Sequence, residues 1–83
     1  MMNPLPRIDV HGMTREQALA TLRINLCHFY ETGFPEVHVV HGHGQGILKS
    51  AVRATLRTIG YVKSIKRATQ SEGGDGVTIA VFK

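Results

Sequence analysis

Two histidine–glycine elements carry the residue types best suited to chemistry in this 83-residue chain. The first is Asp9-x-His11-Gly12, in which a carboxylate and an imidazole stand two positions apart. The second is His41-Gly42-His43-Gly44-Gln45-Gly46, with glycine at every second position. An imidazole titrates near neutral pH, and a neighbouring carboxylate can fix its tautomer. Two imidazoles close to one phosphodiester are the minimum for its cleavage by general acid–base catalysis.

The glycine-rich element is typical of a turn that binds phosphate. Glycine lets the backbone adopt positive φ and approach a ligand with no Cβ in the way. A helical pattern begins near Ile47, so the unpaired N–H groups and the positive dipole end of that helix would face the turn. The same glycines would also suit a tight strand-to-helix turn with no ligand. We predict that phosphate is bound by Gly12, Gly42, His43, Gly44, Gln45 and Gly46.

Three basic residues share one face of the helix that follows the glycine turn. Lys49, Arg53 and Arg57 are spaced i, i+4 and i+8. This face could follow a nucleic-acid backbone, or it could simply be solvated. The formal net charge of +4 favours nucleic acid as the partner only slightly, because many small domains are as basic. We include the three residues in the predicted phosphate-binding set.

The histidines and the carboxylate also raise the question of a metal ion. Asp9, His11, His41 and His43 have the chemistry of metal ligands. No motif with fixed metal-ligand spacing is present, so the sequence assigns no metal site. It leaves the cofactor unknown and a divalent cation such as magnesium or manganese open, since activating a water on DNA commonly uses one.

The elements that would position these residues follow the order βαβαββ. Alternating patterns predict strands at 7–11, 37–40, 62–68 and 77–82. A helix is predicted from the Thr14 cap, which matches a capping box with Gln17, to about Glu31. A second helix is predicted from near Ile47 to Gly60. Apolar residues at helical spacing give the helices buried faces, which include Tyr30 in the first and Ile47 in the second.

These elements predict an α/β two-layer sandwich. Strands joined through helices should be parallel, and two right-handed crossovers place both helices on one face of the sheet. The last strand follows a short loop and should be antiparallel to its neighbour, which gives a four-stranded mixed sheet. Ligands bind beyond the C-terminal ends of parallel strands. If the first two strands are neighbours, both histidine–glycine elements meet at one edge, and we expect the catalytic residues to be Asp9, His11 and His41.

Length and composition restrict the class of protein. Residues 7–83 suffice for one domain, and residues 1–6, which hold two prolines, are predicted to be a flexible lead-in. Cys27 is the only cysteine, so no internal disulfide can form. No run is apolar enough for a membrane span or a signal peptide. The sequence therefore predicts a cytoplasmic protein without a membrane partner.

The two elements together resemble the Smr (small MutS-related) domain. Ile8-Asp9-Val10-His11-Gly12 resembles the family's LDLHG, and residues 41–49 resemble its HGxGxGxLR. Residues 61–64 and 73–78 are similar to the C-terminal domain of MutS-type paralogues. His43 stands where the family pattern usually has lysine or arginine. The resemblance implies nucleic-acid binding, nicking endonuclease activity in several members and action on RNA in others.

Two hypotheses about function follow. The first is a nuclease domain that nicks DNA or cuts RNA, which needs the Asp9, His11 and His41 set. The second is a non-catalytic nucleic-acid-binding module of a larger DNA-repair, recombination or ribosome-associated protein, which needs only the glycine turn and the basic face. In either case the partner is nucleic acid, and the chain is expected to be part of a longer MutS-type polypeptide.

Overall fold

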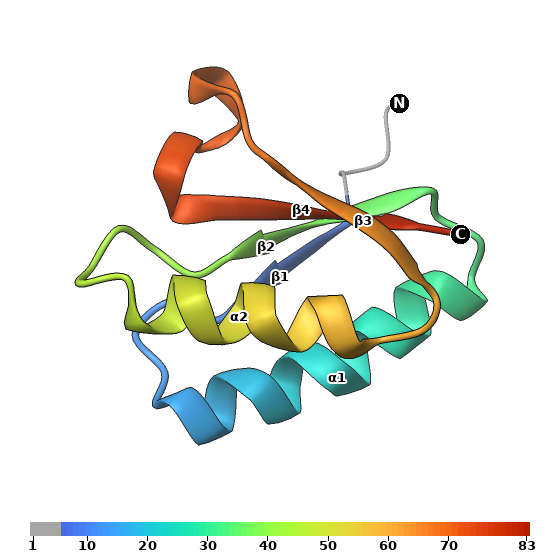
Figure 1. Cartoon of the computed structure of the whole chain (residues 1–83), viewed down its shortest axis with the longest axis horizontal. Helices are drawn as coiled ribbons and strands as arrows, with labels where there is room; N and C mark the ends of the chain where they lie inside the picture. Colours follow the sequence, from blue (N-terminus) through green and yellow to red (C-terminus); the bar gives the residue numbers. More distant parts are fainter. Residues whose placement is uncertain (1–5) are drawn as a thin grey trace.

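A computed structural model describes residues 6–83, which form a two-layer α/β sandwich (Figure 1). Two helices lie side by side against one face of a four-stranded sheet, as predicted. The elements are β1 (Arg7–Asp9), α1 (Arg15–Glu31), β2 (Glu36–Val40), α2 (Ile47–Thr58), β3 (Val62–Arg67) and β4 (Val77–Phe82). Two single 3₁₀ turns, η1 (Gln70–Glu72) and η2 (Gly74–Gly76), connect β3 to β4. Of the predicted lead-in at residues 1–6, all but Pro6 lies outside the described residues.

The strand order in the sheet is β1-β2-β4-β3. β1 pairs with β2 in parallel, and β4 pairs with both β2 and β3 in the antiparallel sense. The three strands that are joined through helices therefore run in one direction, as right-handed crossovers require. The prediction of a mixed sheet with an antiparallel last strand is confirmed, and β1 and β2 are neighbours. The last strand is inserted between β2 and β3, so it is central rather than at an edge.

Local signals fix the bounds of α1. The Thr14 hydroxyl accepts the Gln17 N–H at 3.2 Å, and the Gln17 side chain accepts the Thr14 N–H at 3.1 Å, which completes the predicted capping box. At the other end Gly33 has a φ of +89°, and its N–H donates to the Tyr30 carbonyl. Neither helix in the described part of the chain is long and apolar enough to cross a membrane.

The core lies between the helices and the sheet. Alternate residues of the strands face the helices there and meet Ala18, Leu22 and Leu26 of α1 and Val52 and Leu56 of α2. Two predicted core residues are not buried, and both lie near the ends of their helices. Tyr30 is 38% exposed and stacks on Tyr61 at a ring-centroid distance of 4.4 Å, and Ile47 is 62% exposed.

Candidate functional site

The two histidine–glycine elements meet at the C-terminal ends of β1 and β2. Asp9 lies opposite Val40 in the parallel pair, and the Val10 N–H donates to the Val40 carbonyl at 2.8 Å. One step further along, a Cβ placed on Gly42 would lie 3.3 Å from the Cβ of His11. The predicted meeting of the two elements at one edge of the sheet is therefore present in the structure.

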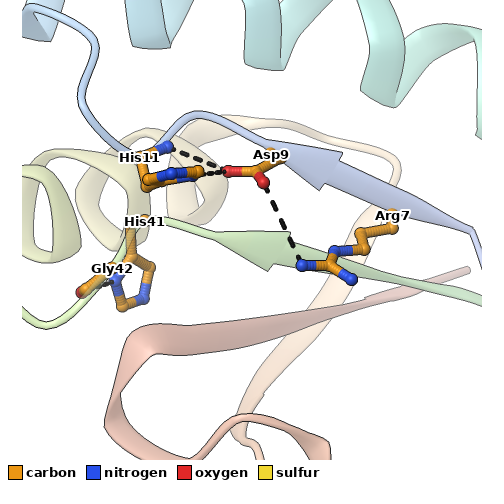
Figure 2. A network of polar contacts seen from close by, with 5 residues as sticks. All are labelled: Arg7, Asp9, His11, His41 and Gly42. Carbon is orange, nitrogen blue, oxygen red and sulfur yellow. Dashed lines mark hydrogen bonds and ion pairs between the residues drawn. The ribbon is translucent and has the colours of Figure 1, made fainter.

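Asp9 and His11 form a hydrogen-bonded pair at the surface (Figure 2). Asp9 Oδ1 contacts His11 Nδ1 and also accepts the His11 backbone N–H at 3.1 Å. The hydrogen bond to His11 is the main cause that lowers the pKa of Asp9, so this carboxylate is ionised at neutral pH and only accepts. An accepting carboxylate places the ring proton on Nδ1 and leaves Nε2 of His11 free. Because the His11 side chain is 67% exposed, a ligand can reach that nitrogen.

His41 has a different environment, because both of its ring nitrogens have partners inside the fold. Nδ1 lies 3.0 Å from the Gly42 carbonyl, and Nε2 lies 2.9 Å from the Thr78 hydroxyl. A carbonyl can only accept, so Nδ1 carries the proton and Nε2 accepts from Thr78. The Thr78 oxygen in turn accepts the Arg53 Nε–H at 3.0 Å. The result is one hydrogen-bonded chain from α2 through β4 to the glycine turn.

The His41 side chain and the Asp9–His11 pair follow opposite faces of the sheet, although His11 and His41 both line the pocket at the N-terminus of α2. Val37 and Val39 on β2 face the helices, and His41 continues that alternation, whereas Asp9 and His11 continue the face of Arg7. Figure 2 shows the His41 ring directed away from His11 and Asp9. His41 is only 4% exposed. Burial is the main cause that lowers its pKa, and the charges of Arg53 and Lys49 act in the same direction, so the ring is neutral at pH 7.

The turn is also held by the residue that precedes β4. The Gly76 carbonyl accepts the backbone N–H groups of His41 and Gly42, each at 3.0 Å. The His43 ring lies against Gly76, where an added Cβ would come within 2.9 Å of His43 Nε2. Sequence reasoning missed both Gly76 and Thr78. The one signal for Thr78 was a single polar residue within the apolar run 77–82.

The glycine turn forms a pocket at the N-terminus of α2. Gly42 and Gly46 have φ values of +83° and +84°, so these two positions need glycine, whereas Gly44 is outside the left-handed region. Gly46 is the N-cap of α2 and makes no side-chain capping bond, which leaves the first N–H groups of the helix open to a ligand. The pocket, of about 370 Å³, is lined by His11, Gly12, Met13 and residues 41–49. All the predicted phosphate-binding residues of the turn therefore line one pocket.

The predicted basic face has partners within the domain. Lys49 Nζ lies 3.7 Å from Asp75 Oδ1, and Arg53 donates to Thr78. Arg57 is exposed one turn further from the pocket. Of the three, Lys49 alone lines the pocket, and phosphate binding by Arg53 and Arg57 stays a prediction. Within residues 6–83, no three His, Cys, Asp or Glu side chains are grouped closely enough to hold a metal ion.

Comparison with known proteins agrees with this architecture. A model of the Smr domain family matches residues 8–83. "Endonuclease MutS2" of Caldanaerobacter subterraneus is 40% identical over 74 residues, which are 89% of this chain and 9% of that protein. "Endonuclease MutS2" of Clostridium perfringens is 40% identical over 78 residues, which are 94% of this chain and 10% of that protein. The chain thus spans about a tenth of the length of these curated relatives.

Solved structures match along most of the chain. The Smr domain of Thermus thermophilus MutS2 superimposes with a TM-score of 0.91 at 32% identity, covering 95% of this chain and 99% of that one. YdaL, a stand-alone small MutS-related protein from Escherichia coli, has the same fold, with a TM-score of 0.88 at 18% identity over 93% of this chain and 63% of its own. The family match from Ile8 to Lys83 and the shared fold together show that the chain belongs to the Smr domain family.

Proposed function

We propose that this domain binds a strand of DNA or RNA and cuts one of its phosphodiester bonds. The observation that carries the proposal is the shared pocket. It is lined both by the exposed His11, whose Nδ1 contacts an ionised carboxylate, and by the residues that begin α2, whose N-terminus has no side-chain cap. The curated relatives that match this chain are named endonucleases, which supports the same class of reaction.

The turn supplies the binding half of the proposal. Backbone N–H groups at the start of α2 and the positive end of its dipole attract a phosphate. Lys49 lies at the same pocket and adds a cation. These groups contact phosphate and not bases, so they would bind any sequence.

His11 supplies the chemical half. With Nδ1 held by Asp9, its Nε2 can take a proton from the nucleophile or give one to the leaving oxygen. On RNA the nucleophile is the neighbouring 2′-hydroxyl, so two imidazoles suffice. On DNA a water must be activated, for which a divalent cation is the common solution. His43 lines the same pocket as His11, and we propose it as the second imidazole.

His41 is better suited to positioning than to proton transfer. Both of its nitrogens are occupied, its ring is buried, and it lies on the helix side of the sheet. We propose that it holds the Gly42 carbonyl and thereby sets the path of the turn. The predicted set of Asp9, His11 and His41 is therefore divided in this proposal between chemistry for the first two and positioning for the third.

Replacing Gly44 with alanine tests the binding half. Gly44 has no positive φ, and an added Cβ meets nothing within 4 Å, so the substitution leaves the fold unstrained. The methyl group would project where a phosphate approaches the backbone. We expect nucleic-acid affinity to fall roughly tenfold or more, equivalent to about 1.4 kcal/mol. Fluorescence anisotropy with a labelled oligonucleotide at fixed salt measures it.

Gly60→Ala is the matched control. Gly60 follows α2 at its other end, also lacks a positive φ and also has open space around its Cβ position. It should bind as the wild type does. If Gly44→Ala binds as tightly as Gly60→Ala, the glycines serve only the turn. If the wild type binds but cuts neither DNA nor RNA, the domain is a binding module.

A further inference from the structure

The face of the sheet opposite the helices carries a second pocket, larger than the first. Its volume is about 660 Å³, within the range of small-molecule sites. Figure 1 shows the segment between β3 and β4 rising on this side of the sheet, away from both helices. The lining includes Arg7, His38, Val40, His43, Glu72 and Val77.

The pocket combines an apolar floor with aromatic and polar groups. Val40 and Val77 are paired residues on adjacent strands and form the floor. The exposed imidazole of His43 is a ring system of the kind on which unstacked bases are held, whereas His38, whose side chain is only 12% exposed and lies 3.6 Å from Glu36, forms part of the wall. Ser71 and Glu72 of η1 line the same space. A flat, partly apolar ligand with a polar edge fits this set of groups better than a phosphate or a simple ion.

Glu72 supplies a fixed acceptor in this pocket. Its Oε1 accepts the Thr69 backbone N–H at 2.8 Å in a capping box, which holds the side chain in place. That hydrogen bond is the main cause that lowers the pKa of Glu72. The carboxylate is therefore ionised at neutral pH and can only accept. Its complement is a ligand edge with N–H donors, such as the ring N–H and amino groups of a nucleobase.

The two pockets are neighbours and share two lining residues. Gly42 and His43 line both of them, so the glycine turn separates the phosphate pocket on one side from the larger pocket on the other. A strand whose phosphate lies at α2 would pass directly over His43 to reach the second pocket.

We propose that the second pocket receives one unpaired nucleobase of the strand that is bound at the glycine turn. The inference rests on the proposed function and narrows its substrate to single-stranded or locally opened nucleic acid. A base within a duplex is stacked on both faces and has its donor edge paired, so it can offer neither to the pocket. Base-specific contact is made with Glu72 and stacking with His43.

The experiment scans a short single-stranded oligonucleotide with one abasic nucleotide at each position in turn. For the wild type, one position of the oligonucleotide should be more sensitive than the others. Removing the base at that position should weaken binding by about 5- to 100-fold, as loss of one base stack does. The blunt duplex of the same sequence, with no abasic site, should bind more weakly than the single strand. Anisotropy at fixed salt gives all these affinities.

Two variants assign the effect to the pocket. Ser71→Trp fills the pocket from an exposed position, and Glu72→Gln keeps the size of the side chain and an acceptor for Thr69. Both should bind the intact strand as weakly as the wild type binds the sensitive abasic strand, and should no longer distinguish the two strands. Glu16→Gln removes one negative charge from α1 and is the control, with wild-type discrimination expected. Circular dichroism and thermal melting verify that each variant is folded.

The outcomes separate this inference from the proposed function. If the wild type binds no nucleic acid, the proposed function fails and the inference with it. If binding is strong and sensitive to Gly44→Ala, but the abasic scan is flat, the proposed function stands and the base pocket is overturned. If folded Ser71→Trp and Glu72→Gln keep the wild-type discrimination, the base lies elsewhere and the inference is also overturned.

Discussion

Replacing His11 with alanine should lower the rate of phosphodiester cleavage by roughly 10²–10⁴-fold, the usual contribution of one general acid–base group. His11 is an exposed imidazole that is hydrogen bonded to an ionised carboxylate through Nδ1 and lines the phosphate pocket. Single-turnover cleavage at saturating enzyme isolates the chemical step from binding. The affinity for the oligonucleotide should change little, because backbone N–H groups hold the phosphate.

Asp9→Asn is the companion variant, and it should lower the cleavage rate by a smaller factor than His11→Ala does. An amide in place of the carboxylate still contacts the ring, but it no longer fixes the tautomer with an ionised acceptor. His43→Ala should lower the single-turnover cleavage rate by a similar factor but should also weaken binding, because His43 lines the proposed base pocket. The double variant should lose about as much cleavage rate as either single one, since groups that act as a unit are not additive. Wild-type rates in a nuclease-free preparation of His11→Ala would place the chemistry elsewhere.

Thr78→Val should destabilise the fold by roughly 1–3 kcal/mol, the cost of leaving a buried polar group unpaired. Valine has the same shape as threonine but lacks the hydroxyl that links His41 Nε2 to Arg53 Nε. Most of the loss should come from His41, because it is buried, whereas Arg53 is only half-buried and can reach water. Urea unfolding, followed by circular dichroism, measures the change.

Thr78→Ser is the control, since serine keeps the hydroxyl and both hydrogen bonds. Thr78→Ser should have a larger free energy of unfolding than Thr78→Val, although serine is smaller than valine and has a lower preference for a strand. A valine variant as stable as the wild type would mean that the chain from Arg53 to His41 does not support the turn. Weaker nucleic-acid binding by the valine variant in its folded state would show that the chain sets the path of the turn.

Much of the fold could be predicted because its signals are local. The capping box at Thr14, the glycine after α1 and the alternation in 77–82 each define an element within a few residues. The position of β4 between β2 and β3 could not be predicted, because strand order depends on pairing between distant segments. Tyr30 and Ile47 are more exposed than predicted, because helical periodicity does not show how far the packing of a helix extends toward its ends.

The candidate site was predictable in its members and less so in its geometry. The meeting of Asp9, His11 and the glycine turn follows from parallel strands that end at one edge. The side on which His41 lies could have been found from the alternation Val37, Val39, His41, which continues the helix-facing row. Thr78 is 37 residues from His41 and 25 residues from Arg53, so no local pattern in the sequence indicates that these three side chains are joined.

The central claim is that the pocket between His11 and α2 holds a nucleic-acid phosphate, and amide chemical shifts test it most directly. The ¹⁵N-labelled domain is titrated with a short single-stranded RNA and with the matching DNA. The largest shift changes should fall on residues 11–13 and 42–49, with little change around Tyr30 and Phe34 at the far end of α1. Changes concentrated at that far end, or none in residues 42–49 at saturation, would contradict the claim.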